Sequence, residues 1–308
     1  TELVISTVGP YALYGELLIE ACVRGGVDYC DLTGEPQWIR RMVDRYEALA
    51  QQSGARIVHS CGFDSIPSDL GVRHLQEAAQ TQFGSYCEKV KMRVVKMKGG
   101  ASGGTIASLT ETMKAAAKNP KIIGLLKSSF ALTPGFEGPS QPSGMMPEYD
   151  SATGTWTAPF VMAPINTKNV HRTNFLLGHP YGRDFVYDEM IMTTLGDAGR
   201  AMAEAIAKAN PFGDSKIAPG DGPSKEEREN GFYDVLFIGE YPDGTQVRAS
   251  VQGDKDPGYG STSKMIAESA LTLLETDTPG GVVTPGAIIA QPLLERLVKH
   301  AGLTFGVE

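Results

Sequence analysis

Three short segments of this 308-residue chain carry the residues best suited to chemistry. Each follows an apolar run and combines glycine with hydroxyl, phenol or carboxyl side chains. The segments read TVGPY at 7–11, DLTGE at 31–35 and SCGFDSIPSD at 60–69. Glycine lets a backbone approach a ligand closely, and carboxyl and phenol groups can exchange protons with a substrate. Each segment alone could be an ordinary tight turn, but three of them together favour a site.

The elements around these segments predict how they meet. Three short apolar runs typical of buried strands alternate with three amphipathic stretches typical of helices. We expect the strands at 3–8, 27–32 and 56–60 and the helices at 13–23, 38–52 and 69–79. Such alternation predicts a parallel sheet with helices on both faces. Because ligands bind outside the carboxyl ends of parallel strands, the three segments should line one cleft.

The pattern changes after residue 86. Residues 89–98 alternate apolar and cationic side chains, which predicts a strand with one solvated face, and the phase change at Val94-Val95 predicts a β-bulge. Further strands are expected at 185–192, 232–240 and 246–251, with helices at 105–118, 198–209, 263–274 and 287–300. Residues 134–154 are rich in Pro, Gly and Ser and predict a long loop, a lid or linker. The second part is therefore expected to be α+β with a mostly antiparallel sheet.

Composition excludes several classes of function. With 28 basic and 36 acidic residues the net charge is −8, which argues against a nucleic-acid-binding protein. The four cysteines form no C-x-x-C pair and the five histidines no H-E-x-x-H pair, so no metal site is predicted. Scattered thiols in a chain of this length are typical of a cytoplasmic protein. No apolar run reaches the length of about 18 residues that a membrane span requires.

The segment Gly100–Gly104 matches G-x-S-x-G, the nucleophile elbow of serine hydrolases. His300 could serve Ser102 as a base. An elbow strand lies inside a mostly parallel sheet and should be continuously apolar, whereas the strand before Ser102 alternates with cations. The alternative is a glycine-rich turn in which Ser102 or Thr105 caps the next helix.

Two further polar segments each allow two interpretations. Residues 166–171, with Lys168 and His171, could reach a site or could start a helix with a solvated face. Residues 253–260 (GDKDPGYG) could bind an anion at a helix start or could be a connecting loop. For residues 253–260 we favour the connecting loop, whereas for residues 166–171 the two interpretations are equally open.

Read in order, these turns resemble the saccharopine dehydrogenase-like oxidoreductases. The segments that carry the resemblance are 4–11, 28–35 and 62–69. The segments KGGASGGTIAS at 98–108 and DPGY at 256–259, together with Val283-Thr284-Pro285 and the final helix, are similar to the branch called trans-acting enoyl reductases. The similarity spans essentially the whole chain.

The resemblance implies a domain organisation. Residues 1–86 would be the C-terminal half of a Rossmann-type NAD(P)-binding domain, and residues 87–308 a substrate and oligomerisation domain whose last helix returns to the first. The family begins with a glycine-rich strand–turn–helix, whereas this chain starts at Thr1 in an apolar strand and has no G-x-G-x-x-G. We therefore expect an N-terminally truncated protein. A homo-oligomer is expected as well.

The resemblance also implies NADP or NAD as cofactor and a site along the three turns. The backbone positions expected to border the cofactor are Thr7, Val8, Gly9, Pro10, Gly34, Glu35, Gly62 and Phe63. Tyr11 and Asp64 are the expected catalytic residues, with Asp31 and Glu35 as second choices. The alternative is that Tyr11 packs and Asp64 caps the following helix.

The implied reaction is hydride transfer to an activated double bond of a lipid or polyketide acyl chain. Three alternatives stay open: reduction of an imine or carbonyl, a serine hydrolase using Ser102, and a cofactor-free acyl-binding protein. Lipid substrates are compatible with peripheral contact with a membrane, although the sequence displays no evident basic amphipathic helix.

Overall fold

The computed structural model describes residues 1–100, 102–209, 217–218 and 220–308. Its first sheet is parallel and has the strand order β1-β2-β3-β10. The strands are β1 (Leu3–Ser6), β2 (Asp28–Asp31), β3 (Arg56–Val58) and β10 (Gly281–Val283). The three strands predicted near the N-terminus are confirmed. The fourth strand, which the sequence analysis did not assign, arrives from near the C-terminus and pairs with β3.

The second sheet has seven strands in the order β11-β9-β8-β4-β7-β6-β5. They are β4 (Lys89–Lys98), β5 (Glu148–Asp150), β6 (Thr155–Pro159), β7 (Val186–Met192), β8 (Phe232–Glu240), β9 (Gln246–Gly253) and β11 (Leu303–Val307). Only β4 and β7 pair in parallel among these described strands. The mixed α/β class, with a parallel sheet followed by a mostly antiparallel one, is therefore confirmed.

The bulge predicted in β4 is present. The register between β4 and β8 shifts between Val94 and Lys96, which leaves Val95 between two paired positions. The prediction of a fully solvated face on this strand is wrong at Arg93, because that guanidinium is buried between the carboxylates of Asp150 and Asp188 at 2.6 and 2.7 Å.

Most helices connect these strands. They are α1 (Tyr11–Tyr14), α2 (Glu16–Gly25), α3 (Pro36–Ser53), α4 (Ile66–Phe83), α5 (Gly103–Lys118), α6 (Pro120–Lys127), α7 (Ala163–Leu176), α8 (Gly196–Lys208), α9 (Lys225–Asn230), α10 (Gly260–Glu275), α11 (Pro285–Ile288), α12 (Ala290–Arg296) and the π-helix η1 (Leu297–Ala301). The helix predicted over 287–300 is thus divided into three pieces. Residues 134–154 lack helix and contain only the short strand β5, as the loop prediction expects.

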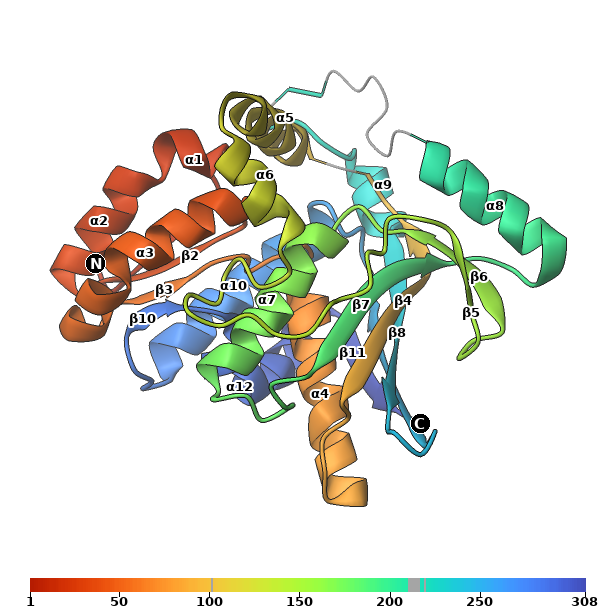
Figure 1. The fold of residues 1–308 in the computed structure, drawn as a ribbon. Helices are drawn as coiled ribbons and strands as arrows, with labels where there is room; N and C mark the ends of the chain where they lie inside the picture. Colours follow the sequence, from red (N-terminus) through yellow and green to blue (C-terminus); the bar gives the residue numbers. More distant parts are fainter. Residues whose placement is uncertain (101, 210–216, 219) are drawn as a thin grey trace.

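Two cores lie on opposite faces of the parallel sheet. Tyr29 and Ile57 face α2 and α3, whereas the next residue of each strand, Cys30 or Val58, faces the core that continues into the seven-stranded sheet. Helix α10 packs on β1 and β2 from that second side, and α4 packs on β8, β9 and β11 (Figure 1). The turns after β1, β2 and β3 lead into α1, α3 and α4, and α4 packs on the second sheet.

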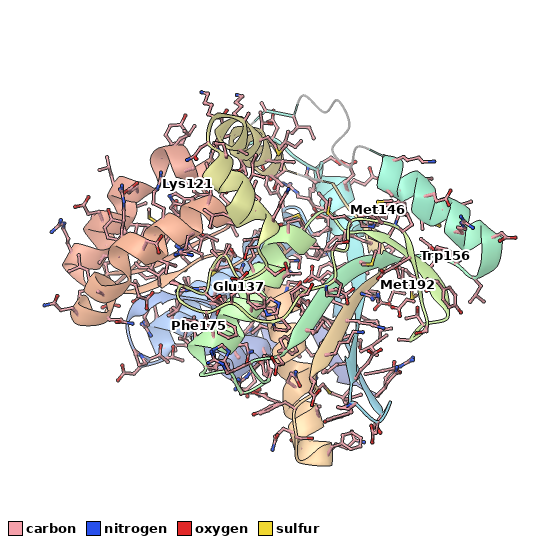
Figure 2. The ribbon with its side chains drawn as sticks, viewed as in Figure 1. Lys121, Glu137, Met146, Trp156, Phe175 and Met192 are labelled. Atoms are coloured by element: carbon pink, nitrogen blue, oxygen red, sulfur yellow. The ribbon has the colours of Figure 1, made fainter. Side chains whose placement is uncertain are left out.

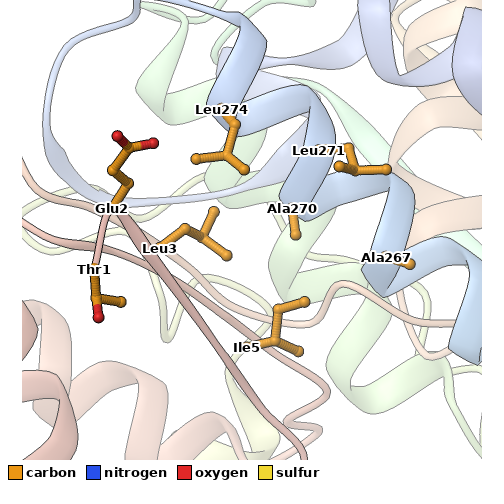
Figure 3. A pocket seen from close by; sticks show the side chains of 8 residues that line it. All are labelled: Thr1, Glu2, Leu3, Ile5, Ala267, Ala270, Leu271 and Leu274. Carbon is orange, nitrogen blue, oxygen red and sulfur yellow. The ribbon is translucent and has the colours of Figure 1, made fainter.

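A surface groove runs along the outer edge of β1, between that strand and α10 (Figure 3). It is lined mainly by apolar side chains: Leu3, Ile5, Ala267, Ala270, Leu271 and Leu274, with Thr1 and Glu2 at one end. None of these residues belongs to the three polar turns, so the groove and the candidate site are separate features.

Candidate functional site

The three predicted turns lie side by side at the carboxyl edge of the parallel sheet. The backbone N–H of Cys61 donates to Asp31 O at 2.7 Å, and Ser60 Oγ donates to Thr33 O at 2.6 Å, which joins the second and third turns. The Leu32 N–H donates to Tyr11 Oη at 3.2 Å, which joins the first and second. The structure therefore brings together the segments that the sequence singles out.

The Glu35 carboxylate ties the first turn to helix α5. It is buried and accepts the backbone N–H groups of Tyr11 at 2.8 Å and Ala12 at 3.0 Å. It also accepts the hydroxyl of Ser108, on α5, at 2.8 Å. Burial raises the pKa of Glu35 even though these three donors oppose the shift. With its acceptor oxygens engaged in this way, Glu35 fixes the shape of the turn.

Tyr11 is buried behind the same turn. Its hydroxyl donates to Ser6 O at 3.1 Å and accepts the Leu32 N–H, and its ring packs on Trp38 with centroids 5.4 Å apart. Burial raises the pKa of Tyr11 above its ordinary value. These contacts suit a residue that positions the strand ends.

The Asp31 carboxylate holds the second turn in place through hydrogen bonds. One carboxylate oxygen accepts the N–H groups of Thr33 and Ser60 at 3.0 and 3.1 Å, and the other lies 2.8 Å from His59 Nδ1. Ser60 has a positive φ of 62°, a conformation that this hydrogen bonding holds in place. Asp31 is completely buried, so it supports the turn and has no access to solvent.

Asp64 differs from these two acids because the residue as a whole is half-buried, whereas Asp31 and Glu35 are buried. Burial raises the pKa of Asp64 to about 7, and the described residues supply no opposing cation or hydrogen bond. A Cβ built on Gly34 would come 3.5 Å from Asp64 Oδ2 and 4.0 Å from Ile165 Cγ2. Gly34 thus leaves room beside a carboxyl group that is partly protonated near neutral pH.

The remaining predicted cofactor positions divide into exposed and buried ones. Thr7 and Val8 are exposed, Gly9 is half-buried and Pro10 is buried. Gly62 and Phe63 are buried: a Cβ on Gly62 would meet Leu32 and Thr262 at about 3 Å, and the Phe63 N–H donates to Thr262 Oγ1 at 2.9 Å. Packing on Thr262 therefore accounts for Gly62 and Phe63.

A buried polar network behind Asp64 was missed by the sequence analysis. Ser65 Oγ lies 2.7 Å from Asp64 O and 3.3 Å from Asn166 Oδ1, both acceptors for its one proton. Asn166 Nδ2 donates to Glu189 Oε2 at 2.8 Å. The Tyr187 hydroxyl donates to Glu189 Oε1 at 2.7 Å. Burial raises the pKa of Glu189 to about 7. This network holds Ser65, the residue that follows Asp64, in place.

For residues 166–171 the helix is confirmed, but the solvated face that this interpretation included is wrong. Helix α7 is buried along most of its length, including its polar residues. Lys168 Nζ donates to the carbonyls of Leu126 and Pro164 at 3.0 and 2.7 Å, and burial lowers the pKa of Lys168 to about 8. Burial lowers the pKa of His171 to about 3. A signal was available, since so many amide and cationic residues in one predicted helix require either a wet face or internal partners.

Curated relatives cover nearly all of the chain. A trans-acting enoyl reductase of Mycobacterium ulcerans is 35% identical over 328 residues, which cover 96% of this chain and 78% of the relative. The Mycobacterium tuberculosis protein Rv2449c, which carries the same family name, is 39% identical with the same coverage. The chain belongs to the trans-acting enoyl reductase family. The interpretation as an oxidoreductase is thereby confirmed.

Alignments with solved structures are of low similarity. Apo saccharopine dehydrogenase (L-Glu forming) from Saccharomyces cerevisiae aligns with a TM-score of 0.45 and 13% identity, covering 100% of this chain and 85% of that chain. Amine dehydrogenase from Mycobacterium smegmatis aligns with a TM-score of 0.41 and 13% identity, covering 93% of this chain and 75% of that one. No protein-family model matches the chain.

In this member of the trans-acting enoyl reductase family, the segment Gly100–Gly104 that matches G-x-S-x-G has a structural role. Ser102 Oγ accepts the Thr105 N–H at 3.2 Å, so Ser102 is the N-cap of α5, and this alternative is confirmed. A Cβ on Gly258 would lie 2.3 Å from Gly100 O, and one on Gly99 would lie 2.5 Å from Pro257. The two similar segments at 98–108 and 256–259 therefore pack on each other.

An acidic side chain also holds the start of α10. Asp256 caps this helix, because its carboxylate accepts the N–H groups of Tyr259 at 3.1 Å and Gly260 at 2.7 Å. Over the described ranges no helix is long and apolar enough to cross a membrane, and no three His, Cys, Asp or Glu side chains there gather into a group that could hold a metal ion.

Proposed function

We propose that the protein is a nicotinamide-dependent reductase of an activated carbon–carbon double bond in an acyl chain. The observation that carries the proposal is the half-buried Asp64 carboxyl, with its pKa raised to about 7, beside Gly34 at the carboxyl edge of the parallel sheet. A general acid works best with a pKa near the operating pH. The names of the relatives support the reaction class, and the location supports the cofactor.

The turn residues would hold the nicotinamide end of the cofactor. Gly9, Pro10 and Gly34 present backbone rather than bulky side chains there, and the space that a Cβ on Gly34 would fill agrees with a closely approaching ring. Either NADPH or NADH would fit this description. The chain has no G-x-G-x-x-G, so these residues do not by themselves account for a pyrophosphate site.

A bound reduced nicotinamide would supply a hydride to the β carbon of a 2-enoyl thioester. Asp64 would then deliver the proton: the carboxyl O–H bond breaks, a C–H bond forms at the α carbon, and the electron pair of the double bond is consumed. Asp64 is left as a carboxylate and regains a proton from solvent. Tyr11, Asp31 and Glu35 would act as positioning residues, because their polar atoms hold the three turns.

The test combines binding with turnover. Nicotinamide fluorescence is titrated with NADPH and with NADH, and turnover is followed with a short 2-enoyl thioester. Asp64→Asn should keep cofactor affinity and lower turnover by about 10²–10⁴-fold, while Asp197→Asn, at an exposed position on α8, should change neither. If Asp64→Asn turns over at the unaltered rate, Asp64 is not the acid.

The same assay separates the alternatives. Turnover of an imine or a carbonyl but not of an enoyl thioester would assign a different substrate to the same acid. Acyl binding without any nicotinamide binding would identify a cofactor-free acyl-binding protein. The homo-oligomer and the cytoplasmic location stay predictions, for which size-exclusion chromatography with light scattering and cell fractionation are the measurements.

A further inference from the structure

Helices α5 and α6 are joined at Asn119 and contact each other on the surface beside the three turns (Figure 1). We call this pair, residues 103–127, the α5–α6 hairpin. Although the hairpin is rich in apolar residues, α6 has no buried residue and α5 has only three. Leu109, Met113 and Ile123 are exposed by 43%, 60% and 41%. Long apolar side chains on a helical hairpin are thus left uncovered.

The same hairpin is basic in a protein of net charge −8. Its lysines are Lys114, Lys118, Lys121 and Lys127, all exposed; Figure 2 labels Lys121. Its one acidic residue, Glu111, is paired with Lys114 at 2.6 Å. The hairpin therefore combines positive charge with exposed apolar side chains. The net negative charge of the whole chain does not indicate this combination, and neither does the predicted helix over 105–118.

The hairpin is fastened to the rim of the candidate site. Ser108 donates to Glu35 at 2.8 Å, and Gln37 Nε2 donates to Thr112 Oγ1 at 2.8 Å. At the other end, Lys168 Nζ donates to Leu126 O at 3.0 Å. A partner that binds the hairpin would therefore lie next to the three turns rather than at a distant surface.

We propose that the α5–α6 hairpin docks on the surface of a lipid bilayer that contains anionic lipids. Lysines near such a surface are attracted to its negative potential, and their stems can extend around inserted apolar groups. Leu109, Met113 and Ile123 have the size and exposure of side chains that enter the boundary between headgroups and acyl chains. An acidic protein is the weaker candidate, because protein interfaces are depleted in lysine relative to other surfaces.

Docking stands independently of the reaction proposed above. One consequence does depend on it: if the substrate is an acyl chain carried in a membrane, docking brings the turns that hold Gly34 and Asp64 to the surface where that substrate is found.

The test is sedimentation of the full chain with vesicles of phosphatidylcholine, with and without phosphatidylglycerol. We expect binding only to the anionic vesicles, weakened by added salt. The triple variant Lys118→Gln/Lys121→Gln/Lys127→Gln should bind more than tenfold more weakly, since each lysine contributes about fivefold. A matched variant on other exposed surfaces, Lys208→Gln/Lys225→Gln/Lys299→Gln, should bind like the original chain.

The apolar part is tested with Met113→Gln, which should weaken binding, against Met202→Gln at an exposed methionine of α8. Equal binding to neutral vesicles, or unaltered binding of the hairpin lysine variant, would overturn the proposal. Binding of an acidic protein to the hairpin without any vesicle binding would overturn it in favour of a protein partner. Turnover of the soluble thioester without vesicles reports separately on the proposed reaction, and thermal unfolding verifies that each variant is folded.

Discussion

Asp64 Oδ2 lies 3.5 Å from the position that a Cβ atom would take on Gly34. The acid and the glycine come from different turns, after β3 and β2, and Ile165 of α7 closes the same space from a third side. The position of a side chain at residue 34 is therefore bordered by Asp64 and Ile165. A larger residue at this position would occupy the place beside the acid.

Gly34→Val should block that space. We expect nicotinamide affinity to fall at least tenfold, because the branched side chain would contact Asp64 and Ile165 and fill the position proposed for the ring. Gly34→Ala should have a smaller effect, since its Cβ makes only ordinary van der Waals contacts. Fluorescence titration of both variants gives the comparison, and equal affinity of Gly34→Val and the original chain would place the cofactor elsewhere.

The raised pKa of Asp64 predicts a pH dependence of turnover and of stability. Turnover should decline as the pH rises through about 7, because the acid loses its proton. The folded-state pKa lies above the unfolded value, so the contribution of Asp64 to stability is fully present below the unfolded pKa and is lost as pH rises through about 7. In Asp64→Asn the free energy of unfolding should therefore fall less steeply between about pH 4 and 8 than it does in the original chain. An unaltered profile in urea titrations would mean that the carboxyl is not desolvated.

Glu35→Ala should destabilise the protein because two backbone N–H groups and the Ser108 hydroxyl lose their acceptor. Leaving buried donors without a partner costs about 1–3 kcal/mol per group. We expect a loss of roughly 3 kcal/mol in chemical denaturation. Glu35→Gln retains one acceptor oxygen and should lose less; if both variants unfold like the original chain, the carboxylate does not hold the turn.

Ser102→Ala distinguishes the cap from a nucleophile. Loss of an N-cap hydroxyl costs about 1 kcal/mol, so a modest drop in thermal stability is expected. Reductase turnover should persist, and any esterase activity of the chain should be the same with and without the hydroxyl. Esterase activity that disappears in this variant would revive the hydrolase interpretation.

The elements that could be predicted from the sequence are those specified locally. The βα alternation and the polar turns after β1, β2 and β3 depend on short-range patterns, and so does the bulge next to Val95. Helix α7 was misjudged because its polar residues find partners far along the chain: Asn166 binds Glu189, and Arg172 binds the carbonyls of Leu132 and Val282. Periodicity says which residues share a face, not which distant groups meet that face.

The site was predictable to the same extent. The three turns were found because glycine and acids follow apolar runs, but the sequence treats Asp31, Glu35 and Asp64 as similar carboxyl groups. Their environments separate them: Asp31 and Glu35 are surrounded by donors, whereas Asp64 is desolvated without one. That difference arises from packing across two sheets and has no short-range signature.

The strand β10 has a consequence for how the protein is made. It pairs Val283 with Val58, and Arg56 on the adjoining strand also binds the Thr276 carbonyl. During synthesis, β3 lies at the edge of an incomplete sheet without its partner β10 until residues 281–283 have been made. Contacts this distant in sequence slow folding and leave an intermediate with an unpaired strand prone to association. The nascent protein is therefore expected to need protection by a chaperone until residue 283 is available.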